Sequence, residues 1–216
     1  VYVPAGRNNP VIFDRKTGKR LRAVSGGGGG TFALLAGEDL VFGPGRTGQL
    51  GFVEEERREK ERNDVFATFS GSHMIVAGAN SYLHANDELY ALDRVRYLKL
   101  EGERKTIDQQ RKKLGVRLKE LRKEKSPDSD KVQNELIANG RRLDEITAEK
   151  KACVLWRVKC AQPHALILVG DTLFAGGYDQ VVAYSATDGQ PAWQAKVNGA
   201  ALGLAADVRE LVELYE

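Results

Sequence analysis

Short apolar runs closed by turn-forming residues make up most of this 216-residue sequence. Each run has about four to six apolar residues and ends at Gly, Asp or Asn, which favour tight turns. Runs of this length are typical of strands, because an amphipathic helix needs a longer periodic segment. Examples begin at Val11 (VIFDRKTG), Thr31 (TFALLAG) and Ala165 (ALILVG). We therefore expect a mainly β fold.

One segment, residues 94–151, has a different composition. It contains only three of the 23 glycines and a single proline, and it has 18 Lys and Arg against 11 Asp and Glu. The rest of the chain has 15 basic and 19 acidic residues, so the total of +3 hides a basic segment in an acidic background. This contrast indicates an insertion into the β fold.

The basic segment carries two apolar seams with a spacing of seven residues. The first seam comprises Leu100, Ile107, Leu114, Leu118 and Leu121, and the second comprises Val132, Leu136, Asn139, Leu143, Ile146 and Cys153. Between them, Ser126 can cap a helix whose first residue is Pro127. The pattern predicts an antiparallel α-helical coiled-coil hairpin over residues 94–152, with arms of about 39 Å at ~1.5 Å per residue. Four polar residues interrupt the seams, namely Arg104, Arg111, Asn139 and Lys150, and Arg111 and Asn139 are candidates for fixing the register.

The predicted first helix has an excess of basic residues that would attract an acidic partner. The candidates for an interaction arm are Arg111, Lys112, Lys113, Arg117 and Arg122. A solvated spacer is the simpler alternative to a docking arm for a protein. Phosphate or nucleic acid is the weaker idea, because after Tyr97 no aromatic side chain is available for base stacking.

Apolar strands recur along the chain at related intervals. They open at Thr31, Ala67, Ala165 and Ala200, with intervals of 36, 98 and 35 residues. Subtracting one repeat from the long interval leaves about the length of the basic segment. Several short strands per repeat of this period are typical of propeller blades, which bury their faces by stacking on their neighbours. We expect a partial β-propeller of three to four antiparallel blades, with the hairpin inserted in the third.

The most informative repeat covers residues 171–193, DTLFAGGYDQVVAYSATDGQPAW. An apolar strand, a strand that ends at Tyr184, a turn that closes at Gly189 and a following Trp193 succeed one another. This order resembles the pyrroloquinoline quinone type propeller repeat. Related segments begin at Val11 and Glu88, although Arg22 replaces the expected Trp in the first. The residues that define the repeat are Trp156, Gly176, Tyr184, Gly189 and Trp193.

The resemblance implies a closed ring of seven or eight blades, so the remaining blades would lie outside this chain. Enzymes of this family hold their quinone with adjacent cysteines and calcium ligands, and neither pattern is recognisable here. The resemblance therefore implies a noncatalytic, bacterial interaction or assembly scaffold without a cofactor, in an extracytoplasmic, periplasmic location. The alternative is part of a larger enzyme, either a quinone-dependent dehydrogenase or a propeller fused to a catalytic domain.

The expected domain organisation follows from these patterns. Residues 1–93 and 153–206 would form the partial propeller, residues 94–152 the insertion, and residues 207–216 a short amphipathic C-terminal helix. The chain starts in a β-branched run without Met, as an excised or processed piece would. No stretch approaches the ~20 apolar residues of a membrane span.

Residue types that carry chemistry are few and scattered, so we predict no catalytic residue and no metal site. His73, His84 and His164 lack metal-ligand or triad spacing. An expanded loop at residues 84–88 is a candidate for lining a pocket. Residues 26–30 are five glycines without the Lys and Ser/Thr of a phosphate loop, so we expect a flexible connector. Cys153 and Cys160 are either bridged or two buried thiols.

Overall fold

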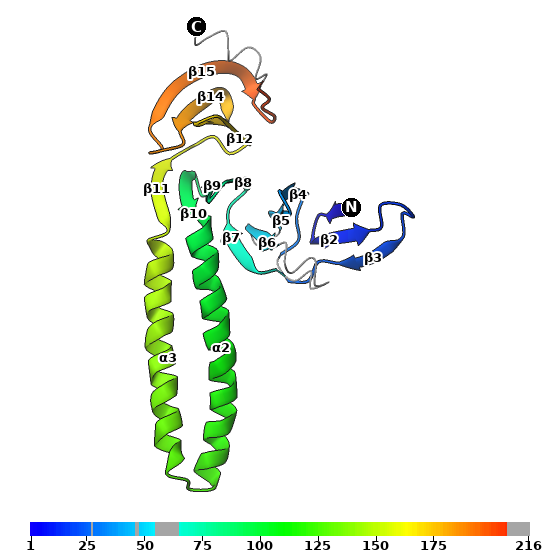
Figure 1. Cartoon of the computed structure of the whole chain (residues 1–216). Helices are drawn as coiled ribbons and strands as arrows, with labels where there is room; N and C mark the ends of the chain where they lie inside the picture. Colours follow the sequence, from blue (N-terminus) through cyan, green and yellow to red (C-terminus); the bar gives the residue numbers. More distant parts are fainter. Residues whose placement is uncertain (27, 46–47, 55–64, 207–216) are drawn as a thin grey trace. The chain divides into compact units, whose positions relative to one another are not determined.

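The computed structural model describes residues 1–26, 28–45, 48–54 and 65–206 (Figure 1). The predicted C-terminal helix at residues 207–216 lies outside the described residues. The chain divides into two compact units, one formed by Val1–Leu92 with Leu155–Glu216 and the other by Asp93–Val154.

The strands form four antiparallel sheets in which each strand pairs with its neighbours along the chain. The first sheet comprises β1 (Tyr2–Ala5), β2 (Asn8–Phe13) and β3 (Arg20–Ala23). The second comprises β4 (Phe32–Ala36), β5 (Asp39–Gly43), β6 (Gln49–Val53) and β7 (Ala67–Ser70). The third comprises β8 (His73–Ala77), β9 (Asn80–Ala85), β10 (Glu88–Asp93) and β11 (Val154–Lys159). The fourth comprises β12 (Ala165–Val169), β13 (Thr172–Gly176), β14 (Tyr178–Ser185) and β15 (Pro191–Ala200). The predicted β-rich fold is confirmed.

Apolar side chains join the sheets in pairs. The first and second sheets share a cluster of Ile12, Val24, Leu40, Phe42 and Val53. The third and fourth sheets share a larger cluster of Tyr82, Leu89, Ala91, Cys160, Leu173, Ala175, Val182, Tyr184 and Ala186. Small antiparallel sheets cannot bury both faces by themselves, so contact with a neighbouring sheet is what gives these strands a core.

The residues predicted to open the four repeats are the starts of sheets in only two of the four cases. The segments at Thr31 and Ala165 do lead into the first strands of their sheets, β4 and β12. Ala67, however, opens β7, the last strand of the second sheet, and Ala200 is the final residue of β15. The first strand of the third sheet is β8, which begins at His73. β7 has four residues and β15 has ten, so strands at the same place in a sheet differ in length, and an apolar run alone does not reveal its place in a sheet.

The loop expected at residues 84–88 is not expanded. Asn86 and Asp87 form a two-residue hairpin turn between β9 and β10, with φ of 50° and 59°. Positive φ at both central positions matches the twist of the flanking strands, and Asn and Asp tolerate it better than most residues. The extra length that the sequence indicated is taken up by regular strand.

The described glycines of the run at residues 26–30 are packed against neighbouring backbone, which contradicts the expected flexible connector. Gly30 and Gly6 exchange two backbone hydrogen bonds of 2.8 and 3.0 Å. Gly29 has a φ of 83°, and a Cβ there would lie 2.6 Å from the Arg7 carbonyl oxygen. Only glycine permits both this conformation and this close approach.

The second unit contains two helices, α2 (Arg94–Lys123) and α3 (Asp128–Lys151), as predicted. The side chain of Asp93 caps α2 by accepting a 3.0 Å hydrogen bond from the Arg96 amide. Pro127 immediately precedes α3, one position earlier than expected. In sequence, the helices stand between β10 and β11, the third and fourth strands of the third sheet. The fourth sheet has a tight glycine turn at the corresponding connection.

The helices contact each other with opposite chain directions. Lys150 donates a hydrogen bond to Glu101 near one end of the pair, and Arg122 donates one to Gln133 near the other. Within the two seams the buried residues are Leu100, Ile107, Leu118, Val132, Ile146 and Cys153, and the other members are half-buried. Arg111 is exposed, and the hydrogen bonds described between the helices involve neither Arg111 nor Asn139, so those two residues are not what ties the helices together.

Candidate functional site

The predicted interaction-arm residues all lie on α2 and are exposed. Arg122 donates a 3.1 Å hydrogen bond to Gln133 on α3. In the part of the chain that the structure describes, Arg111, Lys112, Lys113 and Arg117 form no ion pair. Four neighbouring cations on one helix are therefore available to an external anion.

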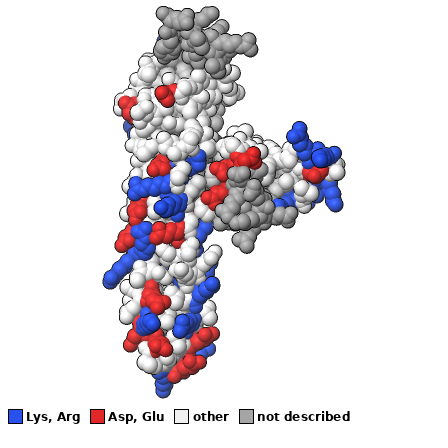
Figure 2. Space-filling view, in the orientation of Figure 1, with Lys and Arg blue, Asp and Glu red and all other residues white. Residues whose placement is uncertain are grey.

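The other end of the helix pair has a different electrostatic organisation, because its charges neutralise one another. Arg142 on α3 contacts Glu103 on α2 at 2.7 Å, and it also contacts Glu145 and Glu149 on its own helix. Figure 2 shows positive and negative side chains interspersed along the visible face of the helices. A ligand would have to break these contacts before it could bind here.

Glu101 is the most buried carboxylate among the described ion pairs of the helices, with a side chain only 7% exposed. It accepts from Arg104 at 2.6 Å and from Lys150 on the other helix at 2.7 Å. Burial opposes ionisation, but the hydrogen bonds from Arg104 and Lys150 outweigh it and hold the pKa of Glu101 below its usual 4.5. The carboxylate therefore stabilises the helix pair above about pH 4.5, and this contribution is lost as the pH falls through the lowered pKa.

We expect Glu101→Gln to destabilise the helix pair by about 1–3 kcal/mol, because it leaves the largely buried Lys150 ammonium without its anion. The measurement is thermal unfolding followed by circular dichroism at 222 nm. Glu145→Gln is the matched control, since Glu145 is 63% exposed and its ion pair should contribute less than about 1 kcal/mol. Equal effects of the two substitutions would contradict the importance of burial.

Exposed apolar side chains lie on the same helices as the four cations that form no described ion pair. Val116 is 59% exposed and lies next to Arg117 in sequence, and Ile137 on α3 is also exposed. Scattered exposed apolar residues are common on any protein. Protein interfaces are enriched in Arg and depleted in Lys, so Arg111 and Arg117 have the more interface-like side chains among these cations.

Three of the five repeat-defining residues, Trp156, Tyr184 and Gly189, lie at the contact between the third and fourth sheets. Trp156 on β11 donates from Nε1 to the Ala186 carbonyl oxygen at 3.0 Å, and its ring lies against Gly189. Tyr184 is buried on β14 and donates to Gln162 at 2.9 Å. Gly176 ends β13, where a Cβ would lie 2.5 Å from the Ala201 carbonyl oxygen. Trp193 on β15 is 53% exposed.

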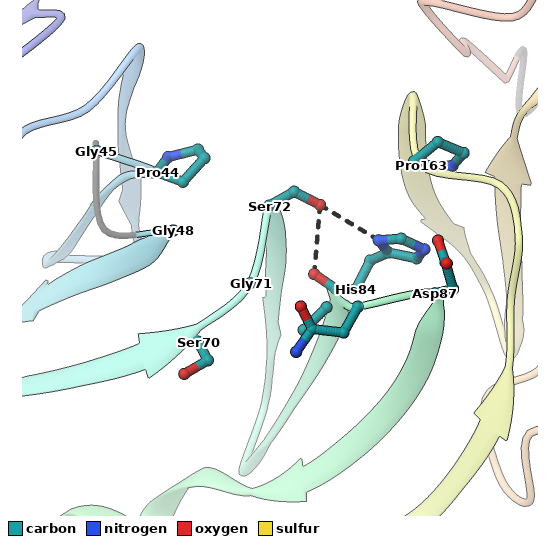
Figure 3. Close-up of a pocket in the computed structure, with 11 residues that line it drawn as sticks. Pro44, Gly45, Gly48, Ser70, Gly71, Ser72, His84, Asp87 and Pro163 are labelled. Atoms are coloured by element: carbon teal, nitrogen blue, oxygen red, sulfur yellow. Dashed lines mark hydrogen bonds between the residues drawn. The ribbon is translucent and has the colours of Figure 1, made fainter.

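A hollow of about 430 Å³ lies between the strand connections of the second and third sheets (Figure 3). Its lining includes Ser70, Gly71, Ser72, His84, Asn86, Asp87 and Pro163, together with Pro44, Gly45, Gly48 and Ala85. The turn at Asn86 and Asp87 therefore lines a pocket, as proposed from the sequence. The Asp87 carboxylate is the charged group among these lining residues.

His84 fixes the wall of this pocket. Its Nε2 donates to the Cys160 carbonyl oxygen at 2.9 Å, because a carbonyl can only accept. The other ring nitrogen, Nδ1, is therefore unprotonated in the neutral ring and lies 3.3 Å from Ser72 Oγ (Figure 3). Since His84 is only 3% exposed, the arrangement favours a structural tie between β9 and the segment before β12.

All three histidines lie in one region, although they are scattered in the sequence. His73 and His84 face each other across β8 and β9, with ring centroids 6.5 Å apart. His164 interacts electrostatically with His73. Sequence reasoning missed this grouping; the signal was the symmetric spacing of residues 73 and 84 about the turn at residues 78–79. Across the described ranges, no group of three or more His, Cys, Asp or Glu side chains is arranged to hold a metal ion.

Burial is the largest effect on His73 and holds its pKa below the ordinary 6.5. The charges of His84 and His164 lower the pKa further, whereas a hydrogen bond with the His164 backbone raises it. The unfolded chain thus binds more protons than the folded chain as the pH falls below about 6.5. We expect the urea midpoint to decrease between pH 7.5 and 5.5. His73→Gln should reduce this pH dependence, and an unchanged dependence would contradict the role of His73.

The two cysteines are free thiols, and both are buried. Cys160 Sγ lies 3.3 Å from the Gln162 side-chain oxygen, whereas Cys153 Sγ contacts the Glu149 carbonyl oxygen at 3.5 Å. Burial raises the pKa of both thiols. These groups are accordingly suited to packing and not to nucleophilic attack.

Comparison with models of known protein families gives no match, and neither does comparison with curated proteins. Among the described residues, no helix combines the length and the apolar character that crossing a membrane requires.

Proposed function

We propose that this chain is part of a noncatalytic bacterial β-propeller scaffold, of the pyrroloquinoline quinone type repeat family, with α2 and α3 as a coiled-coil docking arm. The arm would bind an acidic surface of a protein partner through Arg111, Lys112, Lys113 and Arg117. The observation that carries the proposal is the absence of ion pairs at these four residues in the described structure. Elsewhere on the same helices the charges are paired, as between Arg142 and Glu103 and between Lys150 and Glu101.

The sheet architecture supports the propeller part of the proposal. Four sheets follow one another along the chain, and each is a simple antiparallel meander. The first sheet shares an apolar cluster with the second, and the third shares one with the fourth, as blades do when they stack. The order of Trp156, Gly189 and Trp193 also agrees with the resemblance to the quinone-type repeat, which remains the basis for the family, the bacterial source and the periplasmic location.

The sequence position of the helices supports an arm and not a core element. They occupy the connection between β10 and β11, which in the fourth sheet is a tight turn. An insertion at a turn leaves the strands on both sides free to pair. At ~1.5 Å per residue, the 30 residues of α2 span about 45 Å, which gives an arm considerable reach.

The direct test is binding of a fluorescein-labelled poly-glutamate peptide to the 216-residue chain, measured by fluorescence anisotropy. Replacing Arg111, Lys112, Lys113 and Arg117 together by Gln should raise the Kd about tenfold. Four exposed ion pairs of about 0.3–0.5 kcal/mol each give this factor. The effect should weaken as salt is added.

A matched variant keeps the same change in net charge but places it elsewhere on the helices and on the loop between them. Its four Lys→Gln substitutions are at Lys123, Lys125, Lys131 and Lys151, all exposed. We expect less than about a threefold change in Kd. Equal weakening by both variants, or tighter binding of duplex DNA than of poly-glutamate at the same salt concentration, would reject a protein-docking arm.

A further inference from the structure

The third and fourth sheets carry equivalent pairs of aromatic side chains, but the tryptophan is half-buried in the third sheet and exposed in the fourth. On the third sheet, Tyr82 of β9 lies 6.1 Å from Trp156 of β11, measured between ring centroids. On the fourth sheet, Phe174 of β13 lies 6.3 Å from Trp193 of β15. Both pairs join the second strand of a sheet to the fourth. Tyr82 is only 7% exposed, whereas more than half of Trp193 is exposed.

A glycine turn of the fourth sheet covers Trp156 of the third sheet. The ring of Trp156 lies on Gly189 so closely that a Cβ at this position would be 2.5 Å from Trp156 Cε3. Trp156 also donates to the carbonyl oxygen of Ala186, three residues before the glycine. The turn thus provides a glycine in the left-handed conformation and a carbonyl acceptor three residues before it, and we call this turn the socket. We call the tryptophan that packs on it the plug.

The first sheet contains a second socket with the same backbone hydrogen bonds. In the fourth sheet, Gly189 N donates to Ser185 O at 2.8 Å, and Ser185 N donates to Gln190 O at 2.8 Å. In the first sheet, Gly18 N donates to Asp14 O at 3.0 Å, and Asp14 N donates to Lys19 O at 2.9 Å. The two glycines have φ of 67° and 73°.

The socket of the first sheet is open. A Cβ added to Gly18 would meet nothing within 4 Å. The carbonyl that corresponds to that of Ala186 belongs to Arg15, and within the described residues no donor bonds to it. One exposed plug, at Trp193, and one open socket, at Gly18, thus lie at opposite ends of the series of four sheets along the chain.

The charges of these two sheets are complementary. Residues 1–24, which include the first sheet, contain six Lys and Arg and one Asp. Positive side chains gather at the end of this sheet in Figure 2. Residues 165–206, which include the fourth sheet, contain three Asp and one Lys. Opposite charge favours contact between the two surfaces and disfavours contact of either with itself.

We infer that a second copy of this chain covers the fourth sheet, with Trp193 of one copy seated on Gly18 of the next and its indole N–H donated to the Arg15 carbonyl. The two surfaces differ, so the association is head-to-tail and produces a ring if the rotation closes, or a chain of copies if it does not. The inference depends on the plug and socket and not on the cations of α2.

Sedimentation velocity of the purified chain over a range of concentrations tests the association. We expect Trp193→Ala to raise the Kd of self-association at least about thirtyfold, the effect of losing a buried tryptophan anchor. Gly18→Val should block the socket. Because Val is strained at this φ, the double variant Lys16→Glu, Lys19→Glu provides a second test that leaves the turn glycine in place.

Mixing distinguishes this arrangement from other forms of association. Trp193→Ala retains its socket, and the socket variants retain their plug, so a mixture should form a 1:1 complex although neither variant associates alone. The four-residue Gln variant of α2 should associate like the unmodified chain, so that failure of the docking arm and failure of this contact are distinguishable.

Three results would overturn the inference. One is an unmodified chain that stays monomeric at every concentration accessible to sedimentation. Another is a mixture of plug and socket variants that does not form the complex. The third is protection of Trp193 from acrylamide quenching that does not change on dilution, which would show that another part of the same chain covers it.

Discussion

Trp156→Ala is expected to lower the free energy of unfolding of the sheets by about 3 kcal/mol, the lower end of the range for deleting a buried aromatic ring, because Trp156 is half-buried. The substitution opens a cavity between Tyr82 and Gly189. It also leaves the Ala186 carbonyl without the donor at 3.0 Å. The measurement is urea unfolding followed by near-ultraviolet circular dichroism, at protein concentrations low enough to prevent association.

Trp193→Ala is the matched control, because it removes the same side chain from the equivalent place in the next sheet. Trp193 is largely exposed, so we expect a loss of less than about 1 kcal/mol in the dissociated chain. A similar loss in both variants would show that the contact with Gly189 contributes little. It would also weaken the inference of self-association through Trp193, because that inference requires the contact of a tryptophan with a glycine turn to be strongly stabilising.

Ile146→Ala is expected to destabilise the helix pair by about 2–5 kcal/mol. Ile146 on α3 is fully buried in the seam, and truncation removes methyl groups that the neighbouring helix cannot replace without moving. The measurement is thermal unfolding of the full chain at 222 nm. The helical signal should be lost at a lower temperature, while the near-ultraviolet signal of the tryptophans changes little.

Ile137→Ala on the same helix is the control for this substitution. Ile137 is 45% exposed, so the same chemical change should cost less than about 0.5 kcal/mol beyond the small difference in helix propensity. Equal destabilisation would mean that the seam residues of α3 do not provide the main packing of the helices. The coiled-coil part of the proposed function would then lose its basis.

Local chemistry made much of the secondary structure predictable. A seven-residue spacing of apolar residues without interior prolines distinguishes α2 and α3 from the surrounding strands. Likewise, Gly189 closes a turn because glycine adopts a φ of 73° at little cost. Both signals lie within a few residues along the chain, which is the range over which sequence patterns act directly.

Sites formed by distant residues were much harder to predict. His84 and Cys160 are 76 residues apart, and nothing near either residue indicates the hydrogen bond between them. The Glu101 and Lys150 pair was similarly hidden, since the sequence indicated Arg111 and Asn139 as the polar contacts of the seam. A polar side chain at a seam position can turn to a partner on its own helix or to solvent, and the spacing does not distinguish these outcomes.

By itself the sequence determined that the chain is mainly β, that two long helices interrupt it, and that the excess positive charge lies on the segment containing them. The tertiary structure alone decided which strand is first in each sheet, that Gly29 and Gly30 meet distant backbone, and that Trp156 is covered while Trp193 is open. The physical reason is that backbone conformation follows mainly from neighbouring residues, whereas burial depends on which surfaces meet after the chain has folded.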